Sequence, residues 1–178
     1  VELTLINQNK LKLVSENSKF NLLCMPPDNF PLSGENINTK SFEISSQKLL
    51  KLLNKTKISI SNDETRHYLN GIFLHKTKLE NKSFLCGVAT DSHRLSSSSI
   101  AVDNVKSFTS IIIPRKTVFQ LCSLLDNVDE KLFIQTSSNK IKFSLGKIKL
   151  ISKVIDGKFP DYQKVVPKEN NKTLTVSS

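Results

Sequence analysis

Asp91, Ser92 and His93 are the three residue types from which hydrolases build a catalytic triad. A triad, however, needs side chains that converge from separate segments, and three adjacent residues rarely point at one another. The sequence contains no Gly-x-Ser-x-Gly nucleophile elbow, no phosphate-binding P-loop and no Gly-x-Gly-x-x-Gly dinucleotide motif. Asp156 and Asp161 are isolated carboxylates. We therefore predict a protein without catalytic residues.

Metal and redox chemistry have little support in the sequence. His67 and His75 have no partner at metal-ligand spacing, and Cys24, Cys86 and Cys122 form no Cys-x-x-Cys pair. Each cysteine lies in an apolar run, which indicates reduced core cysteines and a cytoplasmic protein. No apolar run approaches the roughly 20 residues needed to cross a bilayer. We predict no metal, no cofactor and no membrane partner.

The strongest chemical signal is positive charge. The formal net charge is +10 at pH 7, from 26 Lys and Arg residues against 16 Asp and Glu residues. This balance makes a polyanion, nucleic acid above all, the first partner to consider. Lys48, Lys51 and Lys55 are spaced three and four residues apart and would form a stripe on one helix face. A Lys-rich protein with a merely solvated helix face is the simpler interpretation, and the charge alone leaves it open.

Strands and helices position these residues. One helix is predicted to begin after Ser45 or Ser46 as its N-cap, and another to begin at Pro114, because these residue types favour helix starts. One strand precedes each helix and three strands follow it. The strands are expected near residues 41–45, 68–75, 83–90, 94–102, 108–113, 132–137, 140–145 and 147–154. Hairpin-linked strands after each helix favour antiparallel sheets with helices on one side, an α+β class.

The chain also resembles itself at a spacing of about 130 residues. Asn9-Lys10-Leu11-Lys12-Leu13 returns as Asn139-Lys140-Ile141-Lys142-Phe143, and Phe30-Pro31 returns as Phe159-Pro160. The segment at 40–46 returns at 172–178. Matches in the same order at one spacing indicate a module that is used more than once. We expect the tail of one copy, a whole copy and the start of a third, as in a piece of a longer protein.

Four segments carry a resemblance to a known family. They are Tyr68-Leu69-Asn70-Gly71, Val88-Ala89-Thr90-Asp91-Ser92-His93-Arg94-Leu95, Ile113-Pro114-Arg115-Lys116 and Asp156-Gly157-Lys158-Phe159-Pro160-Asp161-Tyr162. In this order they resemble the bacterial β sliding clamp, the processivity subunit of DNA polymerase III, over essentially the whole chain. The resemblance implies an α+β DNA-clamp fold, a duplicated βαβββ unit with antiparallel sheets outside and two helices inside. It places the end of a first domain in 1–37, a complete middle domain in 38–165, and a linker with the first strand of a third domain in 166–178.

In this family, two chains of three domains close a ring around duplex DNA. The resemblance therefore implies a homodimer that encircles double-stranded DNA without sequence preference and tethers the replicative polymerase. Sliding favours diffuse attraction to phosphates, which suits flexible ammonium groups. The residues expected to face DNA are Lys48, Lys51, Lys55, His67, Tyr68, Arg115 and Lys116.

The resemblance also implies a cleft that binds peptides of the polymerase and the clamp loader. Such a cleft needs an apolar floor and a few polar groups that orient the peptide backbone. The residues at the family's cleft positions are Leu69, Thr90, Ser92, His93, Arg94, Leu95, Pro160, Lys164 and Val165. Ser92 stands where the family usually has glycine, so a positive φ at this position would strain the loop.

The alternative is a basic nucleic-acid-binding α+β domain that forms no ring. A sequence-specific binder is a further possibility, but it would need a recognition helix or an exposed aromatic platform. The chain has 7% aromatic residues, no Trp and two Tyr. Its Phe residues fall mostly in apolar strand patterns, which indicates a core position. Binding that depends on salt and not on base sequence would favour the clamp.

Overall fold

A computed structural model describes residues 1–30, 37, 41–80, 82–102, 108–167, 171–172 and 174–175. The chain divides into two compact units, Val1–Asn36 and Ile37–Ser178. The predicted linker at 31–38 lies outside the described residues, apart from Ile37. No helix in the described ranges is both long enough and apolar enough to cross a membrane.

The first unit is an antiparallel sheet in the order β1-β2-β3, formed by Glu2–Asn7, Lys10–Ser15 and Ser18–Leu23. A single turn of 3-10 helix, η1 (Pro27–Asn29), follows it. No second layer covers this sheet among the described residues of the unit. Cys24, which was predicted to lie in a core, is therefore only half-buried.

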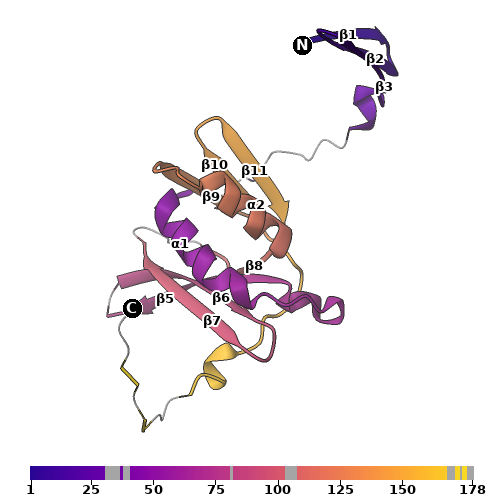
Figure 1. Ribbon diagram of the computed structural model, residues 1–178. Helices are drawn as coiled ribbons and strands as arrows, with labels where there is room; N and C mark the ends of the chain where they lie inside the picture. The colour runs from indigo at the N-terminus through magenta and orange to yellow at the C-terminus, as the bar shows by residue number, and fades with distance from the viewer. Residues whose placement is uncertain are drawn as a thin grey trace. The chain divides into compact units, whose positions relative to one another are not determined.

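The second unit repeats one order of elements twice (Figure 1). The first half consists of β4 (Phe42–Ser45), α1 (Ser46–Thr56), β5 (Gly71–Leu79), β6 (Lys82–Thr90) and β7 (Leu95–Ala101). The second half consists of β8 (Ile111–Pro114), α2 (Arg115–Leu125), β9 (Lys131–Thr136), β10 (Lys140–Leu145) and β11 (Ile148–Lys153). Short 3-10 helices occur at η2 (Lys57–Ser59), η3 (Glu64–Leu69) and η4 (Tyr162–Lys164). The predicted α+β class with a duplicated βαβββ order is confirmed.

The two halves exchange their first strands. One antiparallel sheet has the order β11-β10-β9-β4, and the other has the order β7-β6-β5-β8. Phe42 of β4 therefore lies opposite Ile134 of β9, and Ile113 of β8 lies opposite Ile72 of β5. The exchange joins the halves through continuous backbone hydrogen bonding.

The helix starts repeat this symmetry. The Ser46 N–H donates to the Glu130 carbonyl at 3.0 Å, and the Arg115 N–H donates to the Asn70 carbonyl at 2.9 Å. Each bond joins the first residue of a helix to the residue directly before a strand of the other half: Glu130 precedes β9, and Asn70 precedes β5. The Ser45 hydroxyl also accepts the Lys48 N–H at 3.4 Å, which confirms the predicted N-cap.

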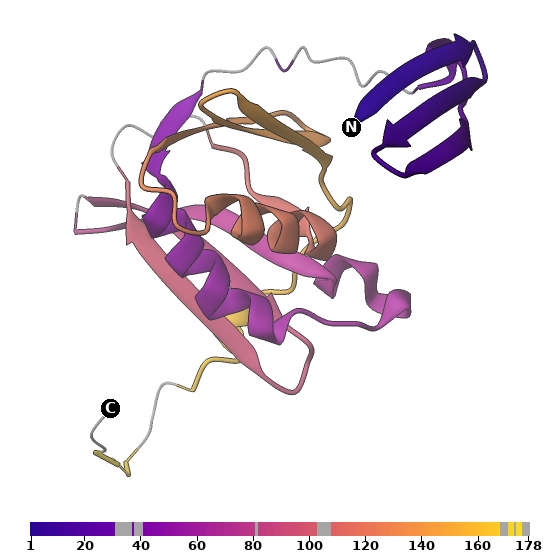
Figure 2. The same cartoon turned by 45° about the horizontal axis from the view of Figure 1, so that its top comes forward.

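One hydrophobic core joins both sheets and both helices. Figures 1 and 2 show α1 and α2 side by side, and both helices contact the sheet that contains β5 and β6. The side chains without solvent exposure include Leu49, Leu52 and Leu53 on α1 and Leu125 on α2. Leu50, predicted on the same face of α1, is only partly buried and packs at the edge of this core.

The repeat at about 130 residues has a structural counterpart. In the first unit the Cys24 N–H donates to the Asn9 carbonyl at 2.8 Å, and in the second the Val154 N–H donates to the Asn139 carbonyl at 3.0 Å. Both asparagines precede the middle strand of an antiparallel hairpin pair, β2 or β10. The same local sequence therefore occupies the same position in a three-stranded antiparallel arrangement twice, β1-β2-β3 and β9-β10-β11.

Two further local predictions are wrong. The strand expected from Tyr68 begins at Gly71, because Asp63 caps η3 by accepting the Thr65 N–H at 2.9 Å. Gly71 is needed at this start, because a Cβ there would collide with the Ile113 carbonyl oxygen. The core assignment of the Phe residues also fails in part, since Phe119 and Phe133 are each 43% exposed.

The strand expected after residue 166 stays a prediction. Val166, Pro167, Asn171, Lys172, Leu174 and Thr175 carry no strand, and the other residues of that segment lie outside the described ranges. A strand forms when a neighbour satisfies its N–H and C=O groups.

Candidate functional site

A groove of about 640 Å³ lies where the β6–β7 loop meets the segment around η4. Its lining residues are Leu69, Thr90, Ser92, His93, Arg94, Leu95, Pro160, Asp161, Tyr162, Val165, Val166 and Pro167. The structure thus brings together every residue predicted for the cleft except Lys164. The Lys164 ammonium instead lies 3.3 Å from the Asp161 carboxylate, outside the lining. Four lining residues were missed: Asp161 and Tyr162, which belong to the Phe-Pro-Asp-Tyr segment, and Val166 and Pro167, which follow it.

The floor of the groove is apolar because it covers a small second core. Leu69 is only 2% exposed and packs with Val88, Ile112 and Phe159. Leu95 and Tyr162 are partly buried against this cluster. Val165 is 69% exposed and offers free apolar surface. An apolar floor with a few polar rim groups is typical of sites that bind peptides or small molecules.

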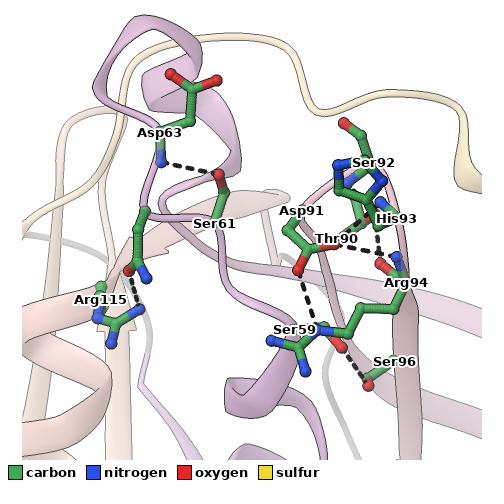
Figure 3. A network of polar contacts seen from close by, with 11 residues as sticks. Ser59, Ser61, Asp63, Thr90, Asp91, Ser92, His93, Arg94, Ser96 and Arg115 are labelled. Atoms are coloured by element: carbon green, nitrogen blue, oxygen red, sulfur yellow. Dashed lines mark hydrogen bonds and ion pairs between the residues drawn. The ribbon is translucent and has the colours of Figure 1, made fainter.

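Asp91 organises the rim of the groove (Figure 3). Its Oδ1 accepts the backbone N–H groups of His93 and Arg94, each at 3.0 Å, and its Oδ2 accepts Nε–H of Arg94 at 3.0 Å. The backbone N–H groups of Arg94 and His93 hold the pKa of Asp91 down at about 2, so the carboxylate stays charged at neutral pH. These partners differ from those of a triad, in which the carboxylate accepts a bond from the imidazole.

Thr90 closes the same loop. Its hydroxyl donates to the Arg94 carbonyl at 2.7 Å and accepts the Ser92 N–H at 3.1 Å. These bonds turn the chain back on itself between β6 and β7, and they leave the side chains of His93 and Arg94 exposed at the groove.

Ser92 has a φ of +79°, which is the left-handed region that favours glycine. A side chain in this conformation costs about 1–2 kcal/mol. Arg66 holds the residue there, because its Nη1–H donates to the Ser92 Oγ at 2.6 Å. The Arg66 Nε–H in turn donates to the Asp63 carboxylate at 2.8 Å. Arg66 was not predicted to act on the groove, because 26 residues separate it from Ser92.

Lys48, Lys51 and Lys55 are all exposed on one face of α1. They border a shallow hollow together with Gln47, Leu50 and Asn54. The opposite face of the helix buries the core leucines, so the position of the stripe follows from helix periodicity. Three ammonium groups this close to one another favour the binding of a polyanion.

A second basic cluster lies where α1 ends and α2 begins. Lys57 Nζ is 5.6 Å and Arg115 Cζ is 5.1 Å from the centroid of the Phe119 ring. Both cations are attracted to the face of this half-exposed ring. Lys57 and Phe119 were missed, because neither residue belongs to the Lys stripe or to the family segments.

The other residues predicted to face DNA do not all lie in one place. His67 and Lys116 lie beside Arg115 in a hollow that also contains Glu64 and Asp156, so its charge is mixed. The Arg115 guanidinium donates to the Asn62 side-chain oxygen. Tyr68 packs instead against the small core under the groove.

The exchanged βαβββ halves, with a basic helix face and an apolar groove, define a DNA-clamp domain. The chain belongs to the DNA polymerase III beta subunit family, because residues 43–161 match the family model described as the central domain of that subunit.

Curated relatives and solved structures agree with this assignment. The Beta sliding clamp of Caulobacter vibrioides is 35% identical over 170 residues, which is 95% of this chain and 46% of the relative. The Beta sliding clamp of Escherichia coli is 36% identical over 160 residues, which is 90% of this chain and 43% of the relative. The chain therefore spans less than half the length of these relatives.

Two solved clamps have closely similar folds. The DnaN sliding clamp of Bartonella birtlesii bound to griselimycin has a TM-score of 0.86 at 40% identity. The match covers 93% of this chain and 45% of the Bartonella chain. The Caulobacter crescentus β sliding clamp, with PEG bound to a putative β-motif tethering region, has a TM-score of 0.87 at 33% identity. The match covers 96% of this chain and 45% of the Caulobacter chain.

Proposed function

We propose that this chain supplies the middle part of a sliding clamp that encircles duplex DNA and tethers the replicative polymerase. The observation that carries the proposal is the convergence of the predicted cleft residues on one groove, in a unit whose α1 presents an exposed row of lysines. The protein acts by holding two partners together and makes or breaks no bond. In the complete clamp, two chains form the ring.

The lysines of α1 suit a protein that must slide. Each ammonium is a flexible, hydrated charge, so it attracts phosphates without locking onto a fixed geometry. Lys57 and Arg115, placed around Phe119, extend the basic surface from α1 to the start of α2. The DNA therefore binds through charge and not through base edges.

The groove accepts peptides of the polymerase and the clamp loader. Its volume of about 640 Å³ lies within the usual range for ligand sites, and its floor can take apolar anchors while Arg94 and Thr90 orient the peptide backbone. Since the Bartonella birtlesii clamp is bound to griselimycin, griselimycin is a suitable probe, and we propose the groove as its site in this chain.

The variants Arg94→Ala and Leu95→Ala are each expected to weaken griselimycin binding about tenfold, as loss of a central contact in a pocket does. Isothermal titration calorimetry on the purified chain measures the change, and circular dichroism checks that the fold is kept. The matched controls are Lys131→Ala and Leu79→Ala, exposed residues outside the groove. Wild-type affinity in both groove variants would exclude this groove as the site.

A further inference from the structure

We propose that His75, which lies on β5 outside the groove lining, is a positioning residue for the groove. Its neutral imidazole holds Tyr162 and thereby fixes residues 159–165, the wall segment, against the sheet. This inference rests on the proposed function of the groove and adds a residue that neither the family segments nor the lining includes.

The central contact joins the wall segment to β5. His75 Nε2 lies 2.9 Å from Tyr162 Oη, and the two rings are 5.8 Å apart at 47°. Tyr162 is the first residue of η4 and lines the groove. Because 87 residues separate the pair, the bond connects parts of the unit that the chain itself does not hold together.

A stack of rings continues this contact. Phe73 lies 4.9 Å from the His75 ring at 24° and 4.9 Å from the Phe159 ring at 7°. Phe159 is buried, and it begins the wall segment. The segment is therefore attached to β5 at two points, by Phe159 on Phe73 and by Tyr162 on His75.

The hydrogen-bond direction depends on the proton of His75. Nδ1 lies 3.4 Å from the Lys76 carbonyl, which assigns the proton to Nδ1 and leaves Nε2 to accept the Tyr162 hydroxyl. An imidazolium could only donate to the Tyr162 oxygen and could not accept its proton, and it would place a charge in a half-buried site. The titratable groups around the pair are Cys86 on β6, Asp161 just before η4, Lys164 at the end of η4, and Lys76 on β5.

The pH dependence follows in sign from burial. Burial lowers the pKa of His75 below its usual 6.5 and raises the pKa of Tyr162. While the wall segment is packed against the sheet, His75 binds a proton less readily than usual. If the wall segment were released, His75 would bind a proton at its ordinary pKa. Docking is at full strength above about pH 6.5, and it weakens as the pH falls below that value.

Amide hydrogen exchange of Lys164 and Val165 tests this inference without a ligand. Their N–H groups donate to the carbonyls of Asp161 at 3.3 Å and Tyr162 at 3.2 Å, so they report on the wall segment. After correction for intrinsic exchange rates, protection in the 178-residue chain should be lower at pH 5.5 than at pH 7.5. Tyr162→Phe keeps the ring and should lower protection at pH 7.5 by about fivefold, the effect of one hydrogen bond.

His75→Gln separates positioning from general packing. Glutamine can still bond the hydroxyl but does not titrate, so protection should no longer depend on pH after the same correction. The control His67→Gln changes an exposed histidine outside the groove lining and should keep the wild-type pH response. Three results would each overturn the inference. The first is protection in the wild type that does not change with pH, and the second is a pH response that persists in His75→Gln. The third is protection in Tyr162→Phe that equals that of the wild type.

A parallel titration with griselimycin distinguishes failure of the positioning role of His75 from failure of the proposed groove function. Weaker binding at pH 5.5 in the wild type but not in His75→Gln supports the positioning role. Equal affinity at both pH values in the wild type overturns that role in the groove. If griselimycin does not bind at all, the proposed groove function fails, while the exchange data still decide whether His75 holds the wall segment.

Discussion

The substitution Leu52→Ala is expected to lower the free energy of unfolding by about 2–5 kcal/mol. Leu52 has no solvent exposure, and its Cγ would lie 3.3 Å from a Cβ placed on Gly87. The glycine thus lets α1 approach β6 closely, and the leucine fills the space between them. The loss of its side chain leaves a cavity that the rigid sheet cannot close. Urea denaturation followed by circular dichroism measures the change.

Leu50→Ala is the matched control, because it removes the same atoms from the same helix at a partly buried position. Its expected cost is about 1 kcal/mol, in proportion to the smaller area that it removes from water. Equal losses in the two variants would contradict the packing described for α1.

The triple variant Lys48→Ala, Lys51→Ala, Lys55→Ala is expected to bind duplex DNA more weakly and with less dependence on salt. If each ammonium neutralises one phosphate, the slope of log affinity against log salt should fall in magnitude by about 2.7, or about 0.9 for each contact. Fluorescence anisotropy of the chain with labelled duplexes, over a series of sodium chloride concentrations, measures this slope. Two duplexes of different sequence should give the same result.

The control for charge is Lys82→Ala, Lys131→Ala, Lys153→Ala, which removes the same number of exposed lysines from strands of the sheets. This control should leave the slope close to that of the wild type. An equal fall in both triple variants would show that net charge alone governs binding and that α1 has no special role.

The sequence was sufficient to predict the element types, because periodicity and helix-start residues are local signals. Ser45 caps α1 as expected, and the order strand–helix–three strands occurs twice. The exchange of β4 and β8 between the sheets was not predictable in this way. Which sheet a strand joins depends on contacts between Phe42 and Ile134, or between Ile72 and Ile113, that are distant in the sequence.

The candidate groove was predicted through the family resemblance and not through composition. Its supporting contacts were missed, because Arg66 reaches Ser92 and His75 reaches Tyr162 across long stretches of chain. Lys164 was misplaced because η4 is a tight turn, in which neighbouring side chains diverge and Lys164 meets Asp161. Single-residue errors of this kind arise from local backbone geometry.

Retention on DNA of different topology tests the central claim most directly. A clamp as long as the curated relatives, loaded by its clamp loader onto nicked circular DNA, should stay bound through a high-salt wash and leave when the DNA is cut to a linear form. The 178-residue chain should wash off both forms, because only charge would hold it on DNA. Equal retention on linear and circular DNA, or salt-resistant retention of the 178-residue chain, would contradict encirclement.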